Sequence, residues 1–333
     1  MKNIPKEETL IDAITDVPGI KVGHSQDLKA ATGCTVIICE QGAVAGVEVR
    51  GGAPGTRETD LLKPINLVEK VQAIYLGGGS AFGLDGASGV MKYLEEQKIG
   101  FDVGLTRVPI VPGAVLFDLA IGDYRIRPNV DMGYEACLNA SERESRQGNI
   151  GAGTGATVGK IMGEQRAMKS GIGTASFRCQ ELMVGAIVAV NCFGDVINPD
   201  TGKIIAGALT EDKKGFINTM SVLKRRPIDK NAESNFPTNT TLGVIATNAK
   251  LTKSEATKIA MMAHNGLARA IIPVHTMYDG DTIFCVSVGE VEADVNLVGA
   301  LSAEVMTRAI IKAIKNSEPL YGLLSYKNLF LTE

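Results

Sequence analysis

The segment from Phe236 to Asn248 combines residue types that can cut an amide bond. Its sequence, FPTNTTLGVIATN, leads from a polar stretch with a proline through two threonines into an apolar, β-branched strand. If the bond between Asn239 and Thr240 were cut, Thr240 would carry a hydroxyl nucleophile and a free α-amine, a base with an ordinary pKa of about 7.7–8.0. The same segment also fits a loop that enters a buried strand, since Thr is common in strands. Both interpretations stay open on these residues alone.

The residues before Thr240 suit a self-cleavage step. The hydroxyl can attack the preceding carbonyl carbon, which moves the acyl group from nitrogen to oxygen and lets water complete the cut. Asn239 is small and tolerates turn conformations, so the peptide to be cut can bend toward the hydroxyl. The polar, weakly periodic stretch 211–239 is predicted to be a mobile linker, which would let the new C-terminus move away.

Two aspartates lie close together before another predicted strand, in the run YDGDT from Tyr278 to Thr282. In an extended chain, residues i and i+2 share a face, so Asp279 and Asp281 are expected to point into one site. Two carboxylates at this spacing can hold an amine or share a proton, with one pKa raised. The glycine between them equally fits a solvated turn.

Lys160 and Asn191 are candidate partners for this chemistry. A lysine can lower the pKa of a neighbouring group, and an asparagine amide can donate a hydrogen bond to an oxyanion. Each also fits a simpler role, as a surface residue or as the last residue of a strand. Their roles depend on whether the fold brings them to Thr240.

The sequence predicts no metal and no cofactor. The three histidines, His24, His264 and His275, are not at metal-ligand spacing with one another or with a cysteine, and the six cysteines include no C-x-x-C pair. The glycine-rich run 77–86 does not match a phosphate loop, because Phe82 occupies the place of the third glycine. We therefore expect neither zinc chemistry nor nucleotide binding.

Composition excludes several other classes of protein. The 333 residues are 45% hydrophobic and 21% charged, which is ordinary for a soluble globular protein. The net charge of −3, without a long block of Lys or Arg, argues against a nucleic-acid-binding surface. The first eight residues lack the apolar stretch of a secretory signal, and no run is long and apolar enough to span a bilayer. We expect a cytoplasmic protein with no membrane partner.

Hydrophobic periodicity predicts alternating strands and helices around one core. Predicted strands are 35–40 and 43–49, joined by a hairpin at Gln41 and Gly42, then 185–191, 241–246 and 282–288. Predicted helices are 84–97, 132–143 with Asp131 as its cap, 253–270 with a capping box, and 293–315. Because residues 240–333 contain few strands, we expect them to share a single domain, 1–333, with the residues before the linker.

Four motifs together carry a resemblance to a known family. They are TDVPGIKVGH (15–24), GGGSAFGL (77–84), GAGTGA (151–156) and NTTLGVIATN (239–248), and they occur in this order. The set resembles the L-aminopeptidase/D-esterase and β-peptidyl aminopeptidase family. Within that family, Asp279 and Asp281 make the chain most similar to the endo-type 6-aminohexanoate-oligomer hydrolases, the nylon-oligomer branch, since peptidase members carry Ser and Glu there.

The resemblance implies a fold and a set of roles. The fold is an α/β class, four-layer α/β/β/α sandwich like that of the N-terminal-nucleophile hydrolases. The chain is cut between Asn239 and Thr240 into a large subunit, 1–239, and a small subunit, 240–333, which stay together, usually in a homotetramer. Thr240 is the nucleophile, a choice over the adjacent threonine that rests on the family register. Asp279 and Asp281 orient its amine.

Further roles follow from the same resemblance. Lys160 and Asn191 match the lysine and the asparagine of the family's site. One departure concerns the run 112–118, where the family often has a tyrosine near the oxyanion and this chain offers Phe117. Either Asn191 and backbone amides suffice, or the rate falls by the factor of about 10²–10³ typical of a lost donor.

The function predicted first is self-processing hydrolysis of linear amides through an acyl-enzyme on Thr240, without a cofactor. The substrate would be a small or oligomeric amide, such as 6-aminohexanoate (nylon-type) oligomers or peptides. Two alternatives within chemistry are an aminopeptidase or β-peptidyl aminopeptidase, and an acyl transferase like the ornithine acetyltransferases. A third alternative is an unprocessed binding protein on the same fold.

Overall fold

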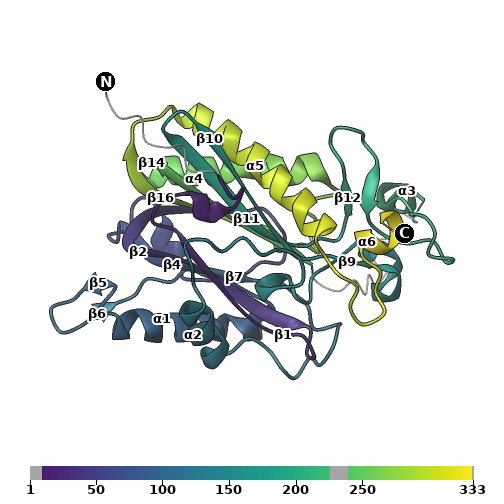
Figure 1. The fold of residues 1–333 in the computed structure, drawn as a ribbon, viewed down its shortest axis with the longest axis horizontal. Helices are drawn as coiled ribbons and strands as arrows, with labels where there is room; N and C mark the ends of the chain where they lie inside the picture. Colours follow the sequence, from purple (N-terminus) through teal and green to yellow (C-terminus); the bar gives the residue numbers. More distant parts are fainter. Residues whose placement is uncertain (1–9, 226–238, 332–333) are drawn as a thin grey trace.

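The strand that begins at Thr240 lies in the middle of a nine-stranded sheet, in a computed structural model that describes residues 10–225 and 239–331. The strand order is β10-β11-β14-β16-β2-β4-β7-β3, with β1 paired to β2 (Figure 1). The strands are β1 Lys21–Asp27, β2 Thr32–Val49, β3 Gly55–Arg57, β4 Lys70–Gly77, β7 Gly113–Val115, β10 Ile172–Cys179, β11 Leu182–Asn191, β14 Thr240–Ala249 and β16 Thr282–Val291.

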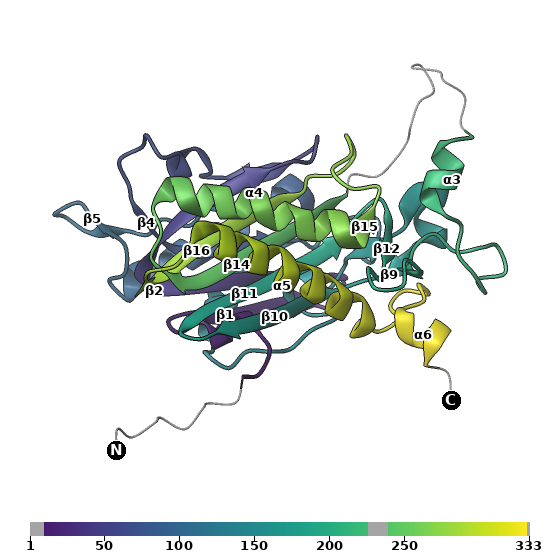
Figure 2. The same cartoon turned by 90° about the horizontal axis from the view of Figure 1, so that it is seen from above.

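Three apolar cores divide the molecule into four layers. The first lies between the long helices α4 (Lys253–Ala270) and α5 (Val295–Lys315) and strands β10, β11, β14 and β16. The second lies between those strands and β1, β2 and β4, and the third between β2 and β4 and helices α1 (Gly86–Glu96) and α2 (Val130–Leu138). Figure 1 shows the two pairs of helices on opposite sides, and Figure 2 shows α4 and α5 side by side. The predicted four-layer α/β/β/α fold is confirmed.

Strand β14 is buried on both faces. Leu242 and Val244 point into the core between the strand layers, while Ile245 points under α4 and α5. This alternation follows from the period of two in a strand, and the burial of both faces explains the continuous apolar run in the sequence. The strand extends the predicted one, 241–246, to Thr240–Ala249.

The hairpin predicted at Gln41 and Gly42 is wrong, because β2 is one continuous strand. Its pairing with β4 runs to Ile38, is interrupted by a register shift and resumes at Ala43, and its pairing with β16 begins at Val44. Gly42 has a φ of +74° there, a conformation that suits a β-bulge. The bulge lets a single strand serve both strand layers.

Two predicted helices differ in how well their ends match. Helix α4 begins and ends as predicted, and Thr252 and Glu255 form its capping box. Helix α2 is shorter than predicted, and Asn129, not Asp131, caps it by accepting from the backbone N–H of Met132 at 3.0 Å. Asn129 has the extended backbone that a cap requires, whereas Asp131 already lies within the helix.

Part of the segment predicted to be a linker is described. Residues 211–225 form turns and the short helix α3 (Thr219–Leu223), and the remainder, 226–238, lies outside the described residues. The carboxylate of Asp195 accepts from both the backbone N–H and the hydroxyl of Thr219, at 2.7 and 2.8 Å. These bonds attach α3 to the segment that follows β11.

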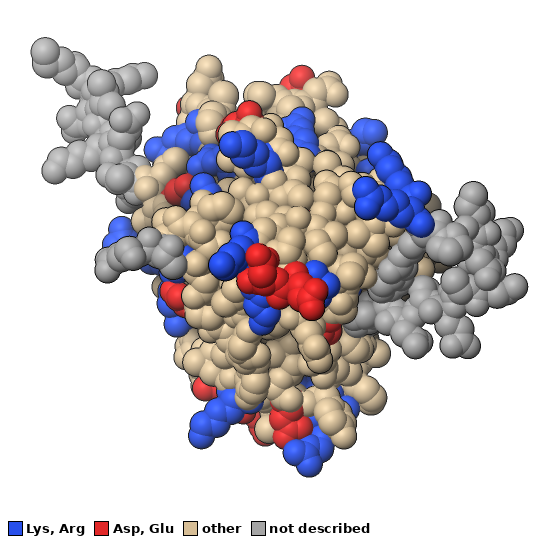
Figure 3. Space-filling model, turned by 90° about the vertical axis from the view of Figure 1, so that its right-hand side faces the viewer, with Lys and Arg blue, Asp and Glu red and all other residues tan. Residues whose placement is uncertain are grey.

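The remaining elements are short. They are β5 Phe101–Asp102 with β6 Arg107–Val108, β8 Thr157–Val158 with β9 Met168–Lys169, the small sheet of β12 Asp195–Ile197, β13 Ile204–Ala206 and β15 Ile271–Ile272, and helix α6 Tyr326–Phe330. No helix among residues 10–225 and 239–331 is both long and apolar enough to cross a bilayer. At the end of the molecule that bears α3 and α6, Lys and Arg side chains are distributed around Asp and Glu side chains near the centre (Figure 3).

Candidate active site

The sheet brings Asn191 and Thr240 together. Asn191 is the last residue of β11, Thr240 is the first of β14, and the two face each other in the antiparallel register. Lys160 begins a short 3-10 helix, and its backbone N–H is bound to the carbonyl of Phe193, two residues beyond β11. Its ammonium donates to the side-chain oxygen of Asn191 at 2.8 Å. All three side chains are buried, so the surface role considered for Lys160 is wrong.

Hydrogen bonds at both ends fix the amide of Asn191. Its oxygen accepts from Lys160 and from the backbone N–H of Thr157 at 3.0 Å, and its nitrogen donates to the carbonyl of Phe117 at 2.9 Å. Because Lys160 and the Thr157 N–H are both donors, the amide atom that faces them must be the oxygen, which sets the orientation of the Asn191 side chain. One of its two N–H groups is therefore committed to a backbone carbonyl. What Phe117 contributes to Asn191 is this carbonyl.

The aspartates lie beside the peptide bond between Asn239 and Thr240. Asn239 forms a parallel bridge with Asp279, in which Asn239 N–H donates to the carbonyl of Tyr278 at 2.7 Å and Gly280 N–H donates to the carbonyl of Asn239 at 2.8 Å. Asp279 and Asp281 are each only 1% exposed, so the interpretation as a solvated turn is wrong.

Asp279 is held near its own segment. One carboxylate oxygen accepts from the backbone N–H of Phe193 and the other from that of Thr276, both at 3.1 Å, and the Thr276 hydroxyl also donates to it. Burial raises the pKa of Asp279 to about 6, and the nearby charge of Asp281 acts in the same direction. A carboxyl with this pKa can accept or release a proton close to neutral pH.

Asp281 bridges β14 to a histidine that the sequence did not single out. One carboxylate oxygen accepts from the backbone N–H of Thr241 at 2.7 Å; the other accepts from His275, at 3.1 Å from the backbone nitrogen and 2.8 Å from Nδ1. The ring of His275 meets that of His264 edge-on, 4.8 Å between centroids. Burial lowers the pKa of His264 to about 4, so this neighbour is neutral at physiological pH.

Thr240 itself is 3% exposed, and its hydroxyl donates to the carbonyl oxygen of Asn239. Burial also lowers the pKa of Lys160, while nearby anionic groups, led by Glu164, oppose that shift. The predicted residues Thr240, Asn239, Lys160, Asn191, Asp279 and Asp281 thus gather in one buried cluster. It combines a hydroxyl, the carbonyl it could attack, a carboxyl that titrates near neutrality and a buried cation.

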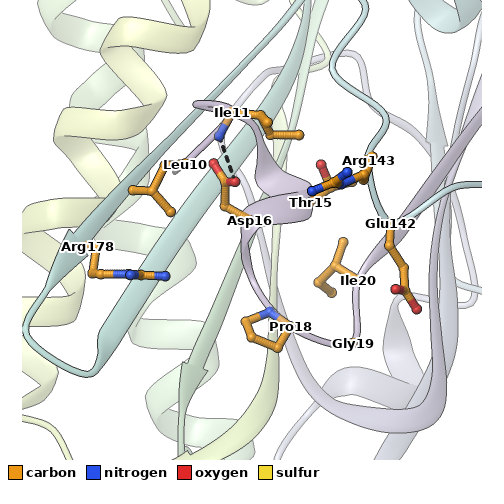
Figure 4. A pocket seen from close by; sticks show the side chains of 10 residues that line it. All are labelled: Leu10, Ile11, Thr15, Asp16, Pro18, Gly19, Ile20, Glu142, Arg143 and Arg178. Carbon is orange, nitrogen blue, oxygen red and sulfur yellow. Dashed lines mark hydrogen bonds between the residues drawn. The ribbon is translucent and has the colours of Figure 1, made fainter. Parts of the chain in front are cut away.

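A surface cavity of about 510 Å³ lies elsewhere (Figure 4). Arg178 on β10 lines it and pairs with Met183 near the start of β11, so the length of β11 separates it from Asn191 by on the order of 25 Å. The hydroxyl that lines it, on Thr15, donates to a backbone carbonyl, and Asp16 accepts from the Ile11 N–H at 2.9 Å. These lining groups are not arranged to cut an amide.

Within residues 10–225 and 239–331, no group of three or more His, Cys, Asp and Glu side chains is placed to hold a metal ion. The buried cluster around Thr240 contains two carboxylates and a histidine. The carboxylate oxygens of Asp279 and Asp281 accept from backbone N–H groups and from the side chains of Thr276 and His275.

Comparisons with known proteins identify the family of the chain. The chain matches Peptidase family S58 over residues 12–326. An uncharacterised aminopeptidase of Mycobacterium bovis is 40% identical, over 96% of this chain and 98% of its own length. A 6-aminohexanoate-oligomer endohydrolase of Kocuria sp. is 29% identical, over 90% of this chain and 85% of its own length.

A solved structure supports the fold. The L-aminopeptidase D-Ala-esterase/amidase of Ochrobactrum anthropi, described as a new variant among the Ntn hydrolase folds, has a TM-score of 0.70 and 17% identity, covering 93% of this chain and 88% of its own. Fold and relatives together define an amide-bond hydrolase on an N-terminal-nucleophile scaffold. The chain belongs to Peptidase family S58. The resemblance found from the four motifs is confirmed, and the non-enzymatic alternative is set aside.

The raised pKa of Asp279 predicts a pH effect on stability. Between pH of about 4 and about 6, the folded chain keeps a proton on Asp279 that the unfolded chain has released. The free energy of unfolding therefore falls as pH rises through this window. Asp279→Asn removes that slope and should gain on the order of 3 kcal/mol over its parent between pH 4 and pH 7.

Denaturant unfolding at both pH values measures this gain, in a Thr240→Ala parent so that the cleavage predicted from the sequence cannot contribute. Asp200→Asn, which changes an exposed aspartate in a turn, is the matched control. If Asp279→Asn gained no more free energy of unfolding than Asp200→Asn, the raised pKa of Asp279 would be contradicted.

Proposed function

We propose that this hydrolase processes itself and then acts through an N-terminal threonine. Thr240 attacks the carbonyl of Asn239 and divides the chain into 1–239 and 240–333. The freed Thr240 then cleaves linear amides through an acyl-enzyme. The observation that carries the proposal is the contact of the Thr240 hydroxyl with the Asn239 carbonyl, inside a buried cluster of ionisable groups.

The neighbours of Thr240 have complementary roles in this scheme. Asp279, with its pKa of about 6, takes the proton of the attacking hydroxyl and returns it to the departing nitrogen. Lys160 compensates the buried negative charge and orients Asn191. Asp281 fixes the backbone of Thr241 and so the direction of the new amine. After the cut, the α-amine of Thr240 is the base for turnover.

The position of the small piece supports a complex that persists after cleavage. Strands β14 and β16, both within residues 240–333, lie between β11 and β2 of the larger piece. Separating the pieces would break two ladders and expose the cores on both faces of β14. The homotetramer implied by the family resemblance is the assembly we propose for the processed chains.

We infer that the substrates are linear amides with a flexible aliphatic backbone, as oligomers of 6-aminohexanoate or as peptides. The oligomer endohydrolase among the relatives and the paired Asp279 and Asp281 favour the oligomers. The aminopeptidase of Mycobacterium bovis favours release of N-terminal residues as the second candidate. Acyl transfer to an amine uses the same acyl-enzyme and is the third.

Intact mass spectrometry tests the self-cleavage. The purified chain should yield fragments 1–239 and 240–333, whereas Thr240→Ala should stay whole because the nucleophile is absent. Thr241→Ala is the matched control, since it removes a neighbouring buried hydroxyl and leaves Thr240 in place. A wild-type chain that stays whole on long incubation, or a Thr240→Ala chain that is cut, would sink the proposal.

Product analysis tests the substrate class. The processed enzyme should shorten 6-aminohexanoate oligomers with release of free amine and carboxylate, and adding an amine acceptor should leave the products unchanged. Acylated acceptor as the main product would identify a transferase instead. Activity confined to peptides with a free N-terminus would identify an aminopeptidase.

Variants of His275 test its role in positioning Asp281. His275→Ala should lower kcat about 10-fold or more with KM little changed, because Asp281 loses a partner that orients it. His275→Asn, whose amide can donate from about the place of Nδ1, should recover much of that loss. Equal kcat for both variants and the wild type would show that His275 only fills space.

A further inference from the structure

The carbonyl oxygen of Asn239 already accepts two hydrogen bonds in the intact chain. One comes from the hydroxyl of Thr240, and the other comes from the backbone N–H of Gly280 at 2.8 Å. Gly280 lies between Asp279 and Asp281 in the sequence. This donor is a backbone N–H, whereas the roles considered so far belong to side chains. The carbonyl that receives it is the one that Thr240 would attack.

These two donors differ once the attack begins. The hydroxyl oxygen becomes the nucleophile and gives up its proton, so its hydrogen bond to the carbonyl oxygen is lost. The N–H of Gly280 stays, and its 2.8 Å distance falls within the 2.7–3.1 Å range of oxyanion donors. Negative charge that develops on the Asn239 oxygen therefore forms against a donor that is already in place.

The peptide group that carries this donor is fixed from both sides. The bond between Asp279 and Gly280 is planar, so its carbonyl and its N–H keep a set direction relative to each other. The carbonyl of Asp279 accepts from the N–H of Ala53 at 2.8 Å, while the N–H of Gly280 points to Asn239. On the other side, the N–H of Asn239 is bound to the carbonyl of Tyr278 at 2.7 Å. Donor and acceptor are thus preorganised.

Close approach explains why position 280 is a glycine. A Cβ there would lie 2.6 Å from the hydroxyl oxygen of Thr240 and 2.6 Å from the carbonyl oxygen of Ala53. The first contact would displace the hydroxyl of Thr240. The second would push Ala53 away from the peptide group between Asp279 and Gly280, which carries the donor. The glycine therefore has a requirement here beyond that of an ordinary turn.

We propose that the backbone N–H of Gly280 is the oxyanion donor for self-cleavage, an inference that rests on the proposed function. In the first step the Oγ–C bond forms, the carbonyl electron pair moves onto the Asn239 oxygen, and the hydroxyl proton passes by way of Asp279 to the nitrogen of Thr240. The C–N bond then breaks and leaves an ester between Asn239 and Thr240. Water cleaves this ester to a carboxylate on Asn239 and the free hydroxyl of Thr240.

An amide-to-ester replacement tests the donor without adding bulk. Glycolic acid in place of Gly280, introduced by nonsense suppression during cell-free synthesis, removes the N–H and adds no side chain. Glycolic acid in place of Gly52 is the matched control, because it removes an N–H bound to the carbonyl of Thr276 at 3.1 Å in the same cluster of loops. The chain made by the same route with glycine at both positions is the reference.

The rate of appearance of fragment 240–333 is the readout. The ester at 280 should slow cleavage about 10²–10³-fold, whereas the ester at 52 should cleave near the reference rate. A bond that only stabilised the folded chain would be lost equally from the ground state and the transition state, so its removal would not slow the reaction. Equal rates at 280 and in the reference, or equal slowing at 280 and 52, would overturn the proposal.

Two further measurements cover poor folding and failure of the parent scheme. In the uncut Thr240→Ala chain with its natural backbone, hydrogen exchange should show the Gly280 N–H protected, and rapid exchange in a folded chain would overturn the proposal. If the reference chain is never cut, the self-processing scheme itself fails. If the reference is cut and Thr240→Ala is not, a normal rate at the 280 ester rejects the Gly280 donor alone.

Discussion

The ammonium group of Lys160 is enclosed by protein, and much of the site follows from the need to compensate that charge. An unpaired ion in the interior is costly, so buried cations are found with hydrogen-bond acceptors and with opposite charges nearby. Asn191 supplies the acceptor at the end of β11, and Asp279, just before β16, is one of the carboxylates whose negative charge acts on Lys160. Each of these groups sits at the end of a strand, so the charge cluster and the sheet edge determine one another.

A second buried lysine shows a different way to meet the same cost. The ammonium of Lys169 donates to the backbone carbonyls of Gly153, Ala156 and Ser170. Burial lowers the pKa of Lys169 to about 7, so its charge is only partly retained at neutral pH. It binds the glycine-rich run that leads into β8, and Thr157, the first residue of β8, donates its backbone N–H to Asn191. The positioning of Asn191 therefore draws on both lysines.

Sequence patterns succeeded where short-range geometry decides the outcome. The capping box of α4 depends on residues three apart, and the i, i+2 rule placed Asp279 and Asp281 in one site. Patterns failed where distant partners decide. The bulge in β2 lies inside its pairing with β4, just before the pairing with β16 begins, and no local feature at Gly42 reports these distant partners. The backbone of His275 has a φ of +57°, and its ring binds Asp281; no periodicity in the sequence predicts this conformation or this contact.

The family resemblance identified residues that take part through their side chains, and it missed the contacts made by backbone groups. At position 117 the sequence drew attention to a missing hydroxyl, yet Asn191 is bound there through a carbonyl that any residue would supply. At position 280 the sequence suggested a turn, yet the glycine brings an N–H to Asn239. Main-chain donors and acceptors are common to all residue types, so their direction becomes visible only once the fold is known.

The place of β14 in the sheet sets the order of folding and cleavage. Thr240 meets Asn191 only after β14 has inserted beside β11, and it meets the segment before β16 only after β16 has paired with β14. The groups that would drive cleavage therefore come from segments that are far apart along the chain and close only in the finished sheet. A cut after Asn239 would then show that the molecule had folded, and the chain would gain its N-terminal nucleophile only after the sheet was complete.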